Sequence, residues 1–223
     1  MRYLLVFLAG LLILQSCSRH SGTPIVPVNK DLKARFGFKP GSYWIYRDSV
    51  TGETDSAYVY STQTNYMYKG CLLYSGEPEF EYNTVFVRVA RNNGSLDSER
   101  WNFNMEESSF NMACVNSADR VESQLSFNLF NWPFITGAPS TSGCVLPPDV
   151  SVVTNVVSPL TLAGQTYSNL ARSNHVPGVT DSSLVYNDFF YVSEDVGIVK
   201  LVFDHPTIPV HRVLELQRSH IIR

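Results

Sequence analysis

Titratable side chains are spread along the chain, and their spacing matches no catalytic or metal-binding motif. The histidines are His20, His175, His205, His211 and His220. None of them belongs to an H-E-x-x-H or H-x-H pattern, in which two imidazoles can reach the same metal ion. The adjacent carboxylates Glu106-Glu107 and Glu194-Asp195 are expected at strand ends or in turns, where solvated charge is ordinary. We therefore expect no metal and no cofactor.

The sequence signatures of common enzyme classes are also missing. The chain has no G-x-S-x-G elbow, no G-x-x-x-x-G-K-[ST] phosphate loop and no S-x-x-K motif. A hydrolase would require titratable side chains that converge in a cleft, and no spacing in the sequence predicts such a site. We expect that the protein is not an enzyme.

Cysteine supplies the clearest chemical signal in the sequence. Cys17 follows Leu14-Gln15-Ser16 at the end of an apolar run, and Arg2 precedes this run. A positive residue, an apolar stretch and a small residue before the cleavage point are the parts of a secretory signal. The alternative is an uncleaved anchor with an incidental cysteine, but the run is shorter than the ~20 residues that span a bilayer.

This segment resembles the signal of bacterial lipoproteins, which is cleaved before a cysteine that is then acylated. The resemblance implies a signal peptide over residues 1–16, lipidation of Cys17 and a tether over residues 17–35. Ser18 stands where an aspartate would retain a lipoprotein in the inner membrane, so the outer membrane is implied. No acidic residue follows directly, which favours the periplasmic face over the cell surface. The membrane is thus the expected partner of the N-terminus.

The other cysteines are Cys71, Cys114 and Cys144, and no C-x-x-C spacing links them to redox or zinc chemistry. Three cysteines in an oxidising compartment allow one intrachain disulfide at most, and all three pairings stay open. The alternative is that they are buried small apolar residues.

The charge of the chain excludes nucleic acid as an expected partner. The formal net charge over 223 residues is −3, and the sequence holds no basic cluster and no long charged run. The length and the aromatic content suffice for one sizeable core. We expect a single domain over residues 36–223.

From residue 36 onward, segments rich in Tyr, Phe, Val and Thr alternate with Gly, Asn, Asp and Ser, a pattern typical of antiparallel strands. Strands are expected over residues 43–48, 55–60, 81–91, 100–105, 110–115, 121–130, 152–157, 165–172, 189–192, 197–203 and 212–216. The one helical candidate is residues 31–36. We predict a mainly β protein with a single curved antiparallel sheet or an open or half barrel, and a β-sandwich is the alternative.

Trp44 and Tyr46 share one face of the first expected strand, because side chains alternate along a strand. Their large apolar area predicts core positions, and the alternative is that these aromatics line a ligand site.

Residues 38–46 read F-K-P-G-S-Y-W-I-Y, and residues 191–200 read Y-V-S-E-D-V-G-I-V-K. These runs are similar to the K-x-G-x-x-W-x-Y opening hairpin and the V-G-[LI]-V-K closing strand of a broad group of uncharacterised small outer-membrane lipoproteins of gut Gram-negative anaerobes. The resemblance implies a strongly curved sheet or open barrel, and it carries over no catalytic residue.

Ser49 and Ser56 are candidate O-glycosylation sites. Asp48-Ser49-Val50 and Asp55-Ser56-Ala57 match the pattern at which the same bacteria attach O-glycans to exported proteins. The alternative is turn chemistry, for which Asp and Ser are common residues.

These observations lead us to expect a lipid-anchored protein that binds a lipid or another amphiphile in its curved sheet. The number of aromatic residues on both faces of the expected strands supports this expectation. The alternative is a non-enzymatic interaction or scaffold module that docks on an outer-membrane protein, with the irregular residues 137–149 as a candidate contact loop. A hydrolase is the third alternative.

Overall fold

The structure of the protein is a computed structural model. It describes residues 25–68, 78–91, 100–107, 109–115, 125–134, 139–141, 150–157, 159–176, 189–205 and 210–223. The expected signal peptide, Cys17, Cys71 and Cys144 lie outside the described residues, as do residues 137–149 except for 139–141.

The described chain is mainly β-strand, as the sequence predicts. Its elements are α2 (Lys30–Phe36), β1 (Tyr43–Asp48), β2 (Thr54–Tyr68), β3 (Pro78–Arg91), β4 (Arg100–Glu106), β5 (Ser109–Val115), β6 (Leu125–Asn131), β7 (Pro139–Thr141), β8 (Val150–Val157), β9 (Leu160–Leu162), β10 (Gln165–Tyr167), β11 (Leu170–Val176), β12 (Phe189–Ser193), β13 (Gly197–His205) and β14 (Val210–His220).

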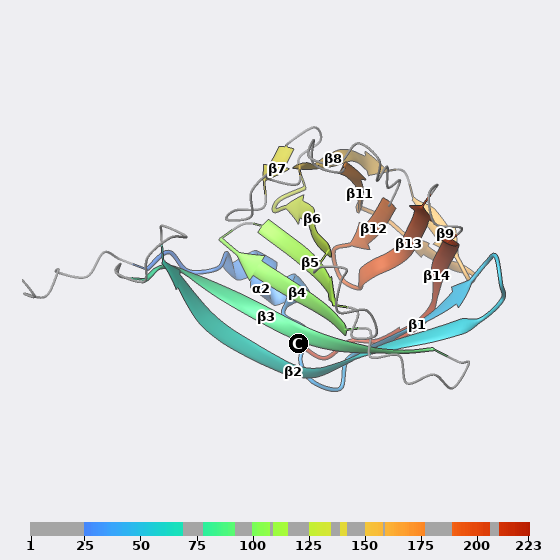
Figure 1. Cartoon of the computed structure of the whole chain (residues 1–223), viewed down its shortest axis with the longest axis horizontal. Helices are drawn as coiled ribbons and strands as arrows, with labels where there is room; N and C mark the ends of the chain where they lie inside the picture. Colours follow the sequence, from blue (N-terminus) through green and yellow to red (C-terminus); the bar gives the residue numbers. More distant parts are fainter. Residues whose placement is uncertain are drawn as a thin grey trace, which may run out of the picture.

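The strands form one antiparallel sheet in the order β6-β5-β4-β3-β2-β1-β14-β13-β12-β11-β8-β7, and β9 and β10 make a separate small hairpin. The sheet is curled into a half-barrel, so the predicted curved sheet is confirmed (Figure 1). The curl brings β6, at one margin of the sheet, against β8 and β11 near the other margin. The first strand lies in the middle of the order, paired with β2 on one side and with the last strand, β14, on the other.

The core fills the inside of this curve. Strand β1 shows how the sequence builds it, because Trp44, Tyr46 and Asp48 are buried while Tyr43 and Arg47 are not. The buried aromatics of β1 belong to one apolar cluster with side chains from β2, β3, β4, β5, β12, β13 and β14. The inner face of the sheet is thus occupied by the protein's own side chains.

Helix α2 contributes to the same core. The side chain of Asn29 caps it, since Oδ1 accepts hydrogen bonds from the backbone N–H groups of Asp31 and Leu32 at 2.9 and 3.2 Å. Leu32 and Phe36 lie one turn apart and are fully buried. Val28 is also buried in the cluster. The helix predicted at residues 31–36 is therefore present, and the core begins before residue 36, inside the segment expected as a tether.

Several strand predictions differ from the structure. Strand β14 runs over Val210–His220 and exceeds the expected 212–216, and β7 (Pro139–Thr141) is a short strand within residues 137–149, which were expected to be irregular. Strand β2 continues through residues 61–68, past the start of β1, and pairs there with β3 (Figure 1). This β2–β3 arm is joined by β4 on the other side of β3 as far as Tyr82, and only its far end is two-stranded. The polar run Thr62-Gln63-Thr64-Asn65 hides this extension, because it lacks apolar alternation. The strand expected at residues 165–172 is instead β10 and the start of β11, separated by Asn169 with φ +54°.

Candidate functional site

The titratable residues considered from the sequence do not form a centre in the described part of the chain. No three His, Cys, Asp or Glu side chains gather there to hold a metal ion. Arg35 instead makes ion pairs with both of the adjacent carboxylates. Its Nη1 lies 3.0 Å from Glu194 Oε2 and 3.4 Å from Asp195 Oδ1. The imidazole of His220 stacks on Tyr43, with ring centroids 5.7 Å apart. No described helix has the length and apolar character required to cross a membrane.

Trp44 and Tyr46 lie in the core, each 1% exposed. Trp44 Nε1 donates to the carbonyl oxygen of Val196 at 2.7 Å, and the Tyr46 hydroxyl donates to that of Ile198 at 2.8 Å. Burial, with a contribution from neighbouring Tyr167, raises the pKa of the Tyr46 hydroxyl well above 10.0. These bonds join β1 to the turn before β13 and to β13 itself. Neither residue lines the pocket described below.

The two candidate glycosylation sites differ in accessibility. Ser49 is exposed in the β1–β2 turn, where its backbone N–H donates to the carbonyl of Val213 at 2.8 Å. Ser56 lies inside β2, is half-buried, and its hydroxyl is 3.5 Å from the carbonyl oxygen of Ala90. Only Ser49 presents its side chain freely to solvent.

Asp48 and Asp55 form a buried ionic cluster with Arg212 on β14. Arg212 Nη2 lies 2.6 Å from Asp55 Oδ2, and its Nε lies 3.2 Å from Asp48 Oδ2. Asp48 Oδ1 also accepts the backbone N–H of Val50 at 2.9 Å. Burial alone would raise the pKa of Asp48, but hydrogen bonds from Val50, Arg212 and Val213 together with the Arg212 charge hold it below its ordinary value.

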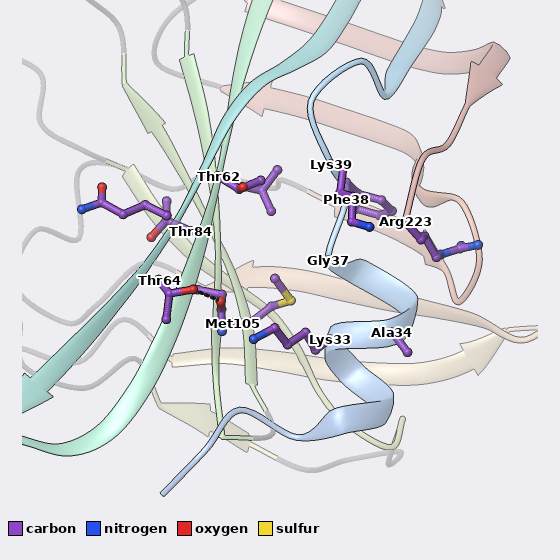
Figure 2. A pocket seen from close by; sticks show the side chains of 13 residues that line it. Lys33, Ala34, Gly37, Phe38, Lys39, Thr62, Thr64, Thr84, Met105 and Arg223 are labelled. Carbon is purple, nitrogen blue, oxygen red and sulfur yellow. Dashed lines mark hydrogen bonds between the residues drawn. The ribbon is translucent and has the colours of Figure 1, made fainter. Parts of the chain in front are cut away.

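A pocket of about 310 Å³ opens where the β2–β3 arm passes over α2 (Figure 2). The residues that line it come from α2 and the segment after it, from three adjacent strands and from the C-terminus. They are Lys33, Ala34, Gly37, Phe38, Lys39, Thr62, Gln63, Thr64, Asn83, Thr84, Val85, Met105 and Arg223.

The inner wall of the pocket is apolar and rigidly packed. Phe38, Val85 and Met105 are each at most 1% exposed and belong to the core cluster. The ring of Phe38 packs edge-on against Trp44, with centroids 4.9 Å apart. These three core side chains close the base of the pocket, and almost none of their own area is accessible.

A polar network lies along the strand side of the pocket. The Thr64 hydroxyl donates to Asn83 Oδ1 at 2.7 Å, and Asn83 Nδ2 donates to Glu81 Oε1 at 2.9 Å. Lys33 Nζ pairs with the same carboxylate oxygen at 3.0 Å. The hydrogen bond from Asn83, followed by that from Lys33, lowers the pKa of Glu81. Because Glu81 already compensates Lys33, this lysine is not available as a free charge.

Two further cations stand at the mouth of the pocket. Arg223 is held in place, because it donates to the carbonyl oxygens of Arg35 and Asp195. Lys39 is exposed, and no carboxylate within the described segments pairs with its amino group. Figure 2 shows Lys39 and Arg223 on the same side of the pocket, across from Thr62 and Thr64. The pocket thus has core side chains at its base and, at its opening, the exposed Lys39, which has no carboxylate partner among the described residues.

Sequence reasoning did not find this pocket. Its residues are far apart in the chain, and its strand side belongs to the part of β2 that the sequence pattern did not predict. The feature of the sequence that could have pointed to the pocket is the helical candidate at residues 31–36, which is followed directly by the lysine-bearing run at 38–46. Comparisons of the chain with protein-family models, with curated proteins and with solved structures gave no match.

Proposed function

We propose that the protein is anchored by a lipid at Cys17 to the periplasmic face of the outer membrane and binds an anionic amphiphile in the pocket between α2 and β2. The observation that carries the proposal is a pocket that the core side chains Phe38, Val85 and Met105 close at its base. At its mouth lies the exposed ammonium group of Lys39, which no carboxylate of the described segments pairs. An apolar chain fits the wall, and a carboxylate or phosphate head group fits the charge.

The size of the pocket limits the ligand. Its volume of about 310 Å³ is at the small end of the range of ligand pockets. A single acyl chain or a compact amphiphile matches this volume better than a diacyl lipid. Burial of apolar surface at about 25 cal/mol per Å² supplies the main driving force, and the head group supplies selectivity.

The pocket, and not the inner face of the half-barrel, is the proposed site. Trp44, Tyr46 and Trp101 fill the inner face and are at most 1% exposed. A ligand there would have to displace packed aromatic side chains, whereas the α2 pocket is open to solvent at its mouth.

Native mass spectrometry of residues 17–223 with Cys17→Ser, purified from the native host without detergent, is the first test. We expect an adduct of lipid mass that detergent removes. Calorimetric titration then compares decanoate with decyltrimethylammonium, which has the same chain length and the opposite charge. We expect decanoate to bind and the cation not to bind.

Variants assign the binding to the pocket. Lys39→Gln should weaken decanoate binding by about three- to tenfold, because it removes a partly screened charge. Thr62→Phe should abolish binding by filling the cavity. Lys30→Gln and Thr51→Phe are matched controls at exposed positions outside the pocket, and they should bind as the parent chain does. Equal binding of both probes, or decanoate binding that survives Thr62→Phe, would contradict the proposal.

The anchor is tested separately in the native host. Cys17→Ser should move the protein from the membrane fraction to the soluble periplasmic fraction and should prevent incorporation of labelled palmitate. Membrane retention of this variant would contradict lipid anchoring and would leave the ligand proposal intact.

A further inference from the structure

The long arm of the sheet has an open edge. Strand β1 accompanies β2 only as far as Val59, whose N–H donates to Ser42 and whose C=O accepts from Gly41. Beyond this point, residues 61–68 of β2 pair with β3 alone, and no other described strand lies on their second side. In an antiparallel strand, alternate residues direct their N–H and C=O groups to opposite neighbours. About half of the backbone groups in residues 61–68 therefore point out of the sheet.

The sequence of this edge lacks the residue types that commonly protect an edge from pairing, and the two register shifts of β2, at Val59/Ser61 and Met67/Tyr68, fall at its ends. Natural sheets guard such edges with lysine, proline, inward-pointing charges or very short strands. Residues 61–68 read S-T-Q-T-N-Y-M-Y, with no charged residue and no proline. The edge also carries exposed aromatic area, since Tyr60 is 38% and Tyr66 is 52% exposed. An unprotected edge of this length is expected to be covered in the working protein.

We propose that the edge is covered by the same segment of a second copy of this chain, in an antiparallel pair centred near Thr64. Because residues 61–68 are uncharged, the self-pairing places no like charges opposite each other. The same lack of charge offers no complementarity to a charged foreign strand. The antiparallel pairing is symmetric, so each copy donates and accepts the same backbone hydrogen bonds.

This arrangement closes after two copies. Both copies use the same edge of β2, so the contact is isologous and closes on itself. At the margins of the described sheet, β6 lies against β8 and β11. A dimer through residues 61–68 uses up the open edge of β2, and growth into filaments is not expected.

The dimer would also change the surroundings of the α2 pocket. The pocket lining and the open edge share three residues, which are Thr62, Gln63 and Thr64. The strand of the second copy would then lie beside the pocket mouth and narrow it. The dimer proposal rests on strand pairing alone and does not depend on which ligand the pocket binds.

Sedimentation equilibrium of residues 17–223 with Cys17→Ser tests the proposal, because this chain keeps every described residue. We expect a monomer–dimer equilibrium and no larger species. Gln63→Lys/Asn65→Lys places lysines on both sides of the centre, and it should raise the dimer dissociation constant about tenfold or more. Gln63→Glu/Asn65→Glu should do the same.

An equimolar mixture of the lysine and glutamate variants is the decisive sample. In the mixed pair, opposite charges face each other, so dimers should return with an affinity within about threefold of the parent. Val50→Lys/Thr51→Lys, at exposed positions in the β1–β2 turn, is the control and should dimerise as the parent does. A parent chain that stays monomeric at several hundred micromolar, growth beyond the dimer, or dimers that survive in both charged variants would overturn the proposal.

Discussion

Arg212 on β14 reaches Asp55 on β2 across the intervening strand β1, with Nη2 2.6 Å from Oδ2. Asp48 on β1 completes the cluster. Both carboxylates are at most 1% exposed and share the single guanidinium group of Arg212. Backbone N–H groups of Val50 and Val213 also donate to Asp48, whereas Asp55 Oδ1 is buried without a hydrogen-bond partner. Removing one member leaves the others buried without their partner, which makes the cluster sensitive to substitution and to pH.

The stability of the protein should fall in acid partly because of Asp48. Its pKa in the folded protein lies below the ordinary value, against about 3.9 in an unfolded chain. The stabilisation is therefore complete above the unfolded pKa and is lost as the pH falls through the folded pKa. Asp48→Asn should lower the free energy of unfolding by about 1–3 kcal/mol at pH 7. The difference from the parent should shrink steadily below pH 4 in urea unfolding curves.

Asp195→Asn is the control for this experiment, because the Asp195 side chain is 71% exposed and its ion pairs with Arg35 and Arg223 are screened. The loss of unfolding free energy in Asp195→Asn should stay below about 1 kcal/mol at every pH. A constant gap between Asp48→Asn and the parent from pH 7 to pH 3 would contradict the role given to the Asp48 charge.

Gly197 should not tolerate a side chain. Its φ is +87°, and a Cβ there would lie 2.9 Å from Cζ of Phe38. Gly197→Ala should lower the free energy of unfolding through both backbone strain and this clash, by about 2–4 kcal/mol in total. Gly164 has φ +79° and nothing within 4 Å of its Cβ position, so Gly164→Ala measures the backbone part alone. Equal losses in the two variants would show that the contact with Phe38 has no cost.

Tyr46 should resist ionisation until the protein unfolds. Burial raises the pKa of its hydroxyl well above 10.0, so its stabilisation is complete below the unfolded pKa of about 10 and is lost as the pH rises through the folded value. In an alkaline titration followed by phenolate absorbance, Tyr46→Phe should remove one tyrosine from the late, unfolding-linked phase. Tyr46→Phe should also lower the free energy of unfolding by about 1–2 kcal/mol, because the carbonyl oxygen of Ile198 loses the hydrogen bond from the Tyr46 hydroxyl.

The control for Tyr46 is Tyr58→Phe, since Tyr58 is 37% exposed on β2. It should change the unfolding free energy by less than about 0.5 kcal/mol. A late phase that is unchanged in Tyr46→Phe would contradict the assignment.

Glycosylation, if the host modifies this chain, should occur at Ser49 and not at Ser56. Ser49 is exposed in a turn, whereas Ser56 is half-buried in a strand that is paired on both sides. Glycopeptide mass spectrometry of protein from the native host should find the glycan on Ser49, and Ser49→Ala should remove the mass shift. Ser56→Ala is the matched control and should keep it. A glycan on Ser56 would require the β1–β2–β3 pairing to open.

Local sequence patterns predicted the elements whose burial alternates along the chain. Strand β1 begins and ends where the pattern places it, because Trp44 and Tyr46 alternate with Tyr43 and Arg47 around a single inner face. The short helix lies at the helical candidate of residues 31–36, with the buried Leu32 and Phe36 one turn apart. In these segments the local pattern and the tertiary environment agree.

The pocket and the ionic cluster could not be predicted in this way. Arg212 meets Asp48 and Asp55 only because the last strand pairs with the first, and sequence spacing does not encode that pairing. Residues 61–68 are strand because β3 supplies hydrogen bonds, in spite of their polar composition. The pocket depends on both features, since α2, β2, β3, β4 and Arg223 must all be in place before it exists.

The pairing of β1 with β14 sets the order of events during synthesis. Tyr43 is paired with His220 and Asp48 with Leu214, so the central pair of the sheet joins residues from the two ends of the domain. Contacts this distant along the chain must wait for the closure of a very long loop, which slows folding. The β1–β14 pair at the middle of the sheet cannot form until the last strand has been synthesised. Neighbouring strands such as β2 to β6 pair in sequence order and can form earlier, so the two halves of the sheet are joined only at the end of synthesis.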